Sequence, residues 1–186
     1  DYNTKRNQLI SEGVLSKDET LYIQECAAGV LAYLQFFYSP LTNELEFFGV
    51  DQRHESDIEG LGRIPAEQQL KSKKVPSFNV IGNSPLVLRE SLLDEVYTMG
   101  ENFVEAAKRV VAPGMNGPFC IEGVYDENAK FTSFEFSARI VAGTNIYMDG
   151  SPYYSLLFNE NMSMGKRIAR EIKNATEKNQ LDKITT

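Results

Sequence analysis

Two hairpin patterns, separated by a long amphipathic helix pattern, most constrain the fold of this chain. Strand-favouring runs at 30–38 and 44–50 flank the turn residues 39–43, and a second pair of runs lies at 119–126 and 130–137. Antiparallel strands can be joined by short loops of this kind, whereas parallel strands need long crossovers. The pattern therefore predicts an α+β fold with antiparallel sheet rather than a parallel βαβ sheet.

The helix between the hairpins is predicted from apolar residues that recur at steps of three and four. These residues are Leu92, Val96, Met99, Phe103, Ala107 and Val110. Ser91 and Asp94 are expected to form a capping box, and Pro113 follows as a stop signal.

The rest of the chain gives weaker signals. We expect a short strand at 21–25, a loop-rich stretch at 51–87 and a second helix at 163–178. Lys166, Arg167, Arg170 and Lys173 of that helix are expected on a solvated flank.

Composition excludes several classes of function. With one histidine and two cysteines, the chain cannot assemble a zinc site of four Cys or His ligands. A net charge of −7 argues against nucleic acid as a partner, because phosphate backbones bind clustered positive charge. The longest charge-free apolar stretch, 29–41, is too short to span a membrane, so we expect a soluble, cytoplasmic protein. The chain begins at Asp1 within a polar helical pattern, which indicates a piece of a longer protein.

The second hairpin carries two acidic residues that the predicted register places opposite each other. A turn centred on Asn128 and Ala129 pairs Glu122 directly with Glu135. Because side chains alternate along a strand, Ser137 should share the face of Glu135. The same alternation places Arg139 on this face, and Phe134 and Phe136 in the core.

Like charges that face each other across a sheet destabilise it, by up to about 1 kcal/mol when exposed. A hard divalent cation, Mg²⁺ or Mn²⁺, would offset the repulsion between Glu122 and Glu135, since Mg²⁺ is held by one or two carboxylates together with substrate phosphate oxygens. Arg139 would then meet the remaining phosphate charge. The alternative is an exposed sheet face with two solvated Glu residues and Arg139 as a simple salt-bridge partner.

This hairpin resembles the second half of the ATP-grasp ligases, which place two Mg²⁺-binding acids on neighbouring strands. Their second acid stands in the motif Glu-x-Asn-x-Arg, and the matching residues here are Glu135, Ser137 and Arg139, with Ser137 in place of the Asn. Several further motifs resemble one branch, the archaeal formate-dependent 5-formaminoimidazole-4-carboxamide ribonucleotide (FAICAR) synthetases. The motifs lie at 82–93, 134–145, 148–153 and 164–172.

The resemblance implies an α+β ATP-grasp fold, in which 21–186 would be the C-terminal domain and 1–20 a partial N-terminal segment of the lid region. The family activates formate with ATP, giving formyl phosphate and ADP. It passes the formyl group to the amino group of 5-aminoimidazole-4-carboxamide ribonucleotide (AICAR) in purine biosynthesis. ATP, formate and AICAR would be the small-molecule partners, Mg²⁺ or Mn²⁺ the cofactor, and Arg139 the catalytic residue that steadies the transferred phosphoryl group.

The resemblance also points to residues that would bind ATP. Segment 23–29 resembles the hinge that reads adenine, where backbone N–H and C=O groups pair with the base edge. The main chain of Gln24, Glu25, Cys26 and Ala27 is the candidate, with a plain strand end as the alternative. Glu55 would accept hydrogen bonds from ribose hydroxyls, or is a solvated loop acid.

Candidate substrate-binding residues lie in turn-like segments. The amide of Asn83 can donate and accept together, which suits the carboxamide of AICAR, although turns also favour Asn for backbone reasons. Thr144, Asn145 and Ser151 lie in loops whose backbone N–H groups would cradle a phosphate, or they form ordinary turns. Arg53 and Arg63 are candidate phosphate clamps, or solvated surface arginines.

Two other functions compete with this interpretation. One is a different ATP-grasp carboxylate–amine ligase, because contacts to formate leave no readable signature in the sequence. The other is a non-catalytic nucleotide-binding or oligomerisation domain. For the ligase as for its rivals, we expect a homo-oligomer.

Overall fold

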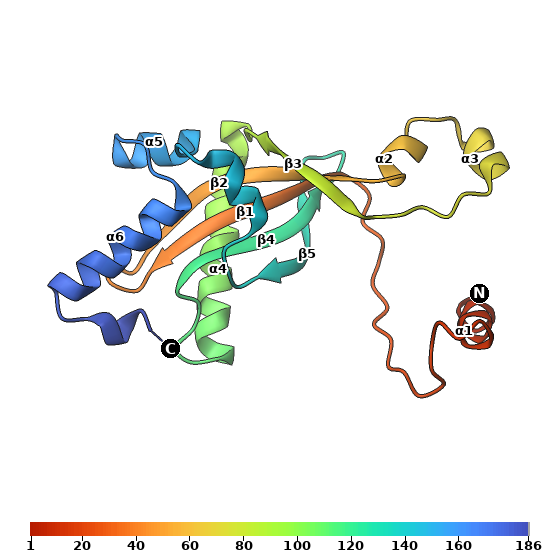
Figure 1. Cartoon of the computed structure of the whole chain (residues 1–186), viewed down its shortest axis with the longest axis horizontal. Coiled ribbons are helices and arrows are strands. Elements are labelled where there is room, and N and C mark those ends of the chain that lie inside the picture. Colours follow the sequence, from red (N-terminus) through yellow and green to blue (C-terminus); the bar gives the residue numbers. More distant parts are fainter. Residues whose placement is uncertain (186) are drawn as a thin grey trace.

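The computed structural model describes residues 1–185, and its centre is a five-stranded antiparallel sheet with helices on both faces (Figure 1). The strand order is β3-β2-β1-β4-β5. The strands are β1 (Val30–Ser39), β2 (Glu44–Glu55), β3 (Val80–Leu86), β4 (Gly117–Tyr125) and β5 (Phe131–Ser137). Both predicted hairpins, β1 with β2 and β4 with β5, are confirmed.

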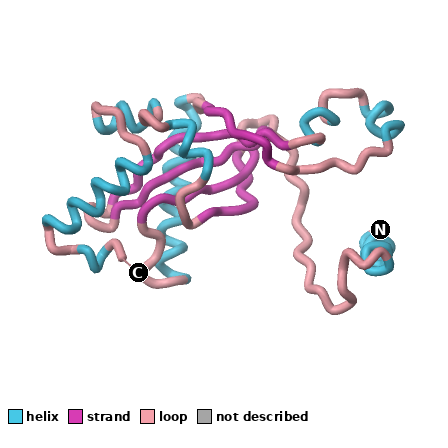
Figure 2. The backbone as a smooth tube through the Cα atoms, viewed as in Figure 1, coloured by secondary structure: helices cyan, strands magenta, loops and turns pink. Residues whose placement is uncertain are grey.

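A long helix, α4 (Leu93–Val110), covers one face of the sheet. Its residues Val96 and Val104 pack in one core cluster with Leu34 and Phe36 of β1. Figure 2 shows this helix running behind the strands. The predicted helix is confirmed, but the capping box is wrong: Ser91 lies inside a short 3₁₀ turn, η1 (Glu90–Leu92), so the chain is already helical where the cap was expected.

The opposite face is covered by η2 (Ala142–Tyr147), α5 (Pro152–Phe158) and α6 (Met164–Glu177). The apolar cluster on this side consists of Phe37, Phe48, Tyr147, Tyr154, Met162 and Met164. Phe36 and Phe47 belong to the α4 side, so neighbouring residues of the first hairpin pack on opposite faces. This hairpin is therefore buried on both faces and forms the centre of the fold.

A buried ionic network attaches α6 to the first hairpin. Arg167 of α6 bonds both oxygens of Glu46 on β2, at 2.7–2.9 Å, and Glu171 at 2.8 Å. Tyr154 donates to Glu46 at 2.7 Å and Ser39 donates to Glu171 at 2.6 Å. The prediction that Arg167 lies on a solvated flank is wrong, because its side chain is only 6% exposed. The short turn η3 (Leu181–Lys183) follows α6.

Two segments extend away from the sheet in Figure 1. The helix α1 (Tyr2–Ser11) is joined to β1 by an extended loop, so the strand predicted at 21–25 is absent from the described structure. The helices α2 (Ile58–Leu61) and α3 (Ala66–Ser72) lie between β2 and β3.

The loop-rich prediction for 51–87 is wrong at both ends, where β2 continues to Glu55 and β3 begins at Val80. The Gly, Asn and Pro residues of β3 obscured its strand pattern in the sequence. They are tolerated because β3 lies at the edge of the sheet, the position within sheets where proline is commonly found. Among the described residues, none of the helices is both long and apolar enough to cross a membrane.

Candidate functional site

A row of polar side chains crosses the sheet on the face that carries η2. The strand register places Tyr33 of β1 opposite both Asp51 of β2 and Glu122 of β4, and Glu122 opposite Glu135 of β5. Directly opposite residues share a face of the sheet, so these side chains form one row. We call this row and its neighbours Arg53 and Asn83 the polar face.

The predicted pairing of Glu122 with Glu135 is confirmed, but the register predicted nearer the turn is wrong, because Tyr125 pairs with Phe131 rather than with Thr132. A bulge beside Glu122 accounts for the difference. The register shifts between Glu122 and Gly123, which leaves Phe134 without a partner on β4. A bulge disturbs the alternation of side chains. Phe134 and Phe136 are 41% and 58% exposed, so the prediction that they lie in the core is wrong. Both belong to β5, the edge strand that α4 covers only in part.

Glu122 is a buried carboxylate whose charge is neutralised by an arginine. It is 2% exposed, and both of its oxygens lie 3.2 Å from the guanidinium of Arg53. Ser137 donates a further hydrogen bond to it at 2.9 Å. The Arg53 guanidinium carbon lies 3.8 Å from the centroid of the Tyr33 ring, which holds the guanidinium in place. Arg53 therefore binds the carboxylate predicted to hold a metal ion.

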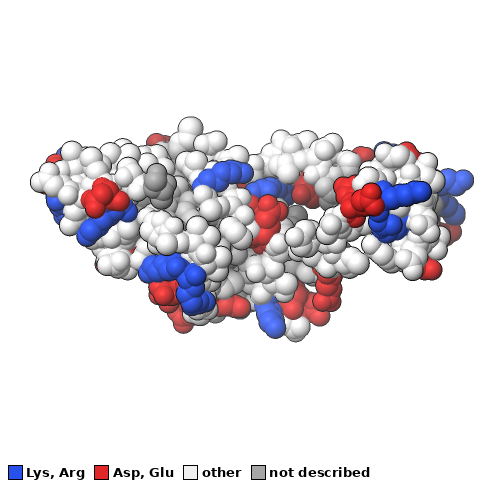
Figure 3. Space-filling view, turned by 90° about the horizontal axis from the view of Figure 1, so that it is seen from below, with Lys and Arg blue, Asp and Glu red and all other residues white. Residues whose placement is uncertain are grey.

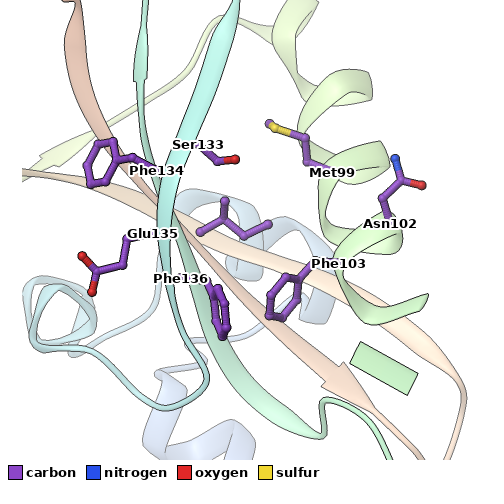
Figure 4. Close-up of a pocket in the computed structure, with 8 residues that line it drawn as sticks. Met99, Asn102, Phe103, Ser133, Phe134, Glu135 and Phe136 are labelled. Carbon is purple, nitrogen blue, oxygen red and sulfur yellow. The ribbon is translucent and has the colours of Figure 1, made fainter. Parts of the chain in front are cut away.

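Glu135 is exposed, and its carboxylate forms no hydrogen bond or ion pair with any other described residue. Figure 4 shows it directed away from α4, on the other side of β5 from Phe103 and Phe136. A groove of about 410 Å³ lies between α4 and β5. The Glu135 carboxylate is on the other side of β5 from most of this groove. Arg139, also exposed, donates to the carbonyl of Ile140 at 2.9 Å and makes no described contact with either Glu.

Asp51 is the buried centre of a second polar group that the sequence analysis missed. It accepts hydrogen bonds from Asn83 at 2.6 Å and from Gln35. Burial raises the pKa of Asp51 above its ordinary value, while these two hydrogen bonds and the charge of Arg53 act in the opposite direction. The sequence does contain a signal for this group, because Asp51 is an acidic residue at the end of an apolar strand pattern. A buried carboxylate requires hydrogen-bond partners.

Gly143 of η2 packs directly against this carboxylate. A Cβ at position 143 would overlap all three atoms of the Asp51 carboxyl group. Gly143→Ala is therefore expected to lower the free energy of unfolding by about 1–3 kcal/mol, the usual cost of overpacking. Urea unfolding of the variant measures this.

Gly82→Ala is the matched control, since Gly82 also lies beside the site, in β3, and a Cβ there meets no atom within 4 Å. Its free energy of unfolding should change by less than about 1 kcal/mol. Equal losses in the two variants would show that contact with Asp51 is not the cause.

Glu55 lies near the same row, at the end of β2. Burial raises the pKa of Tyr33 to about 12; the charge of Arg53 lowers it, and the charges of Glu122, Glu55 and Asp51 raise it further. These charges therefore surround one phenol. The predicted residues that gather around the polar face are Arg53, Glu55, Asn83, Glu122 and Glu135.

Other predicted residues lie elsewhere or use their side chains internally. Thr144 donates to the carbonyl of Val141, while Ser151 is fully buried, donates to Phe48 and caps α5. These hydroxyls serve the fold, and the backbone N–H of Thr144 donates to Val141 at 3.1 Å. A phosphate cradle formed by the backbone N–H groups of Asn145 and Ser151 stays a prediction. Asn145 is exposed.

The hinge candidate is an exposed, extended segment. Gln24, Glu25, Cys26 and Ala27 are all exposed, and none of the backbone hydrogen bonds described for residues 1–185 involves them. Their N–H and C=O groups are therefore free to pair with a ligand. Arg63, in contrast, is 80% exposed and lies beside Glu59, outside the polar face.

Charge is mixed on the molecular face seen in Figure 3. Its Lys and Arg side chains form small separate groups, most of them beside Asp or Glu. This face has no broad basic band of the kind that binds nucleic acid.

The carboxylate oxygens of Glu122 and Glu135 are the type of ligand that a hard divalent cation prefers. No group of three or more potential ligand side chains occurs among the described residues. Mg²⁺, however, needs only one or two protein carboxylates when waters and phosphate oxygens complete its shell. Glu122 and Glu135 meet that requirement because they are carboxylates at directly opposite positions on one face of the sheet.

Comparison with known proteins gives curated relatives that are named as FAICAR synthetases. The chain is 89% identical over 186 residues to the 5-formaminoimidazole-4-carboxamide-1-(beta)-D-ribofuranosyl 5'-monophosphate synthetase of Nitrosopumilus maritimus, and matches 54% of that protein. It is 71% identical to the synthetase of the same name from Cenarchaeum symbiosum, again over all of this chain and 54% of the relative. The chain thus spans about half the length of the curated relatives it matches.

A solved structure supports the fold. The crystal structure of an IMP biosynthesis protein PurP from Thermococcus kodakaraensis matches 87% of this chain and 51% of its own, with a TM-score of 0.73 and 36% identity. The predicted α+β, ATP-grasp fold is confirmed. The family model described as "Domain of unknown function (DUF1297)" matches residues 1–186, and this chain therefore belongs to the DUF1297 family.

Proposed function

We propose that this chain is the C-terminal ATP-grasp portion of a ligase that uses ATP and formate to convert AICAR to FAICAR, through formyl phosphate, in purine biosynthesis. In this proposal residues 21–186 form the ATP-grasp domain and 1–20 belong to the lid region. The observation that carries it is the gathering of Glu55, Asn83, Glu122 and Glu135 around one sheet face in a chain so similar to FAICAR synthetases.

Glu122 and Glu135 would hold Mg²⁺ or Mn²⁺, which when bound would neutralise charge on the phosphoryl group being transferred. The guanidinium of Arg53 contacts both carboxylate oxygens of Glu122, so Arg53 would compete with a cation for these two oxygens. If a cation displaced it from Glu122, the guanidinium of Arg53 could bind two oxygens of a phosphate group instead, because arginine forms bidentate hydrogen bonds with both carboxylates and phosphates. Arg139, exposed just beyond β5, is the second candidate for the phosphoryl group.

ATP would bind through the main chain of Gln24 to Ala27, with Glu55 accepting from the ribose. The free N–H and C=O groups of that segment support its role as the adenine hinge. Asn83 would contact the carboxamide of AICAR. Its half-buried position on edge strand β3 supports this role, because one side of its amide is anchored to Asp51.

ADP formation by the full-length protein tests the proposed function. We expect ADP release to require AICAR, formate and a divalent cation together, and to stop when any one of them is omitted. Acetate in place of formate is the matched control for rival carboxylate–amine ligases. Turnover that does not depend on formate would contradict the proposal, and absence of Mg-ATP binding would favour a non-catalytic role.

A further inference from the structure

A buried carboxylate determines which edge of the Asn83 amide faces outward. Asp51 is 1% exposed, and its Oδ2 accepts a hydrogen bond from Nδ2 of Asn83 at 2.6 Å. Both oxygens of Asp51 accept from amide nitrogens, Oδ1 from Gln35 and Oδ2 from Asn83, so the group of Asn83 that faces the carboxyl group is the NH₂. The orientation of the amide therefore follows from the chemistry of Asp51.

The surroundings of Asp51 keep the carboxylate where it is. Gly143 fills the space beside it, and Gln35 donates to its other oxygen, Oδ1. Gln35 keeps this orientation although its own Oε1 is buried without a hydrogen-bond partner among the described residues. One carboxylate thus fixes the orientation of two amides.

With Nδ2 bonded to Asp51, the outward edge of the Asn83 amide presents one hydrogen-bond acceptor, Oδ1, and one donor, the second N–H. Its Oδ1 and its second N–H take part in no hydrogen bond among the described residues, and the side chain is half-buried at the sheet edge. A primary carboxamide offers the matching donor and acceptor. A carboxylate offers two acceptors, one of which would face Oδ1, and an acceptor opposed to an acceptor is strongly disfavoured.

We propose that Asp51 is a positioning residue that, by orienting the Asn83 amide, makes the site select a nucleotide whose base carries a carboxamide over the same nucleotide with a carboxylate. The inference rests on the proposed function, in which Asn83 contacts the carboxamide of AICAR. It adds the source of specificity and a residue that touches no substrate.

Calorimetric titration of the full-length protein with AICAR and with its 4-carboxylate counterpart tests the inference. We expect the wild type to bind AICAR about 100-fold more tightly than the carboxylate. Asp51→Asn has the same shape but can donate to Oδ1 of Asn83, so the amide can turn over. AICAR affinity should fall about tenfold, while the affinity for ATP and the melting temperature stay unchanged.

Asn83→Ala separates orientation of the amide from support of the fold. In that background Asp51→Asn should change AICAR affinity less than about twofold, because the residue through which it acts has been removed. A tenfold loss that persists there, or an equal loss of ATP affinity, would overturn the inference. If Asp51→Asn does not fold, Asn83→Ala alone must abolish the preference for the carboxamide, and a retained preference overturns the inference.

The wild-type titration distinguishes failure of the Asp51 role from failure of the proposed function. Equal affinity for the carboxamide and carboxylate nucleotides would overturn the role of Asp51 and leave the proposed function standing. Absence of AICAR binding would overturn the proposed function and the inference with it.

Discussion

Replacing Arg167 by methionine is expected to lower the free energy of unfolding by about 3–5 kcal/mol, the cost of breaking a buried ion pair by removal of one partner. The guanidinium is 6% exposed and binds Glu46 and Glu171, whose side chains are 9% and 7% exposed. Its loss leaves two buried carboxylates without a cation. Urea unfolding followed by circular dichroism measures the effect.

Arg170→Met provides the matched control on the same helix. Arg170 pairs with Glu160 at the surface, where the two side chains are 35% and 39% exposed. Solvent screens such a pair, and the expected loss is under about 1 kcal/mol. Similar losses in the two variants would show that burial of the Arg167 network adds nothing.

Removing the charges together should behave differently from removing the arginine alone. Glu46→Leu and Glu171→Leu, added to Arg167→Met, remove the unpaired carboxylates and should restore part of the lost stability. Recovery is expected to be incomplete because Tyr154 and Ser39 lose the carboxylates that accept their hydroxyl hydrogens.

Local patterns allowed the central part of the site to be predicted. The pairing of Glu122 with Glu135 was calculated from a turn centred on Asn128 and Ala129. In the structure the strands next to the turn are one residue out of that register, with Tyr125 opposite Phe131, and the bulge at Glu122 brings the predicted pair together. The same reasoning failed for Phe134, because a bulge arises from packing that no alternation pattern records. The helix α4 was likewise predictable from its apolar period, but its first turn was not.

Contacts between distant segments account for what the sequence did not reveal. Asn83 meets Asp51 only because β3 returns to β2 after the α2–α3 segment, and the pattern of β3 was obscured by its turn-forming residues. Arg167 occupies a polar position in the helical repeat, yet it is buried because Glu46, 121 residues earlier, lies opposite it. Periodicity predicts the face of an element on which a residue lies, but it does not predict which distant residue contacts that face.

Glu135→Gln in the full-length protein is expected to lower the rate of AICAR-dependent ADP formation by at least about 100-fold, the scale of losing one group that stabilises transition-state charge. A neutral amide is a poorer ligand than a carboxylate for a hard cation. Glu135 is a cleaner test than Glu122, because Glu122 also binds Arg53 and Ser137, so its replacement would disturb both.

Stability separates a catalytic effect from a structural one in this variant. Glu135 is exposed and faces Glu122, so removing its charge relieves repulsion, and stability should stay the same or rise by up to about 1 kcal/mol. Glu127→Gln, in the turn of the same hairpin, also removes an exposed charge and should leave turnover unchanged. Wild-type turnover by Glu135→Gln would contradict the metal site, whereas loss of turnover with intact stability would tie the two-carboxylate hairpin to the chemistry.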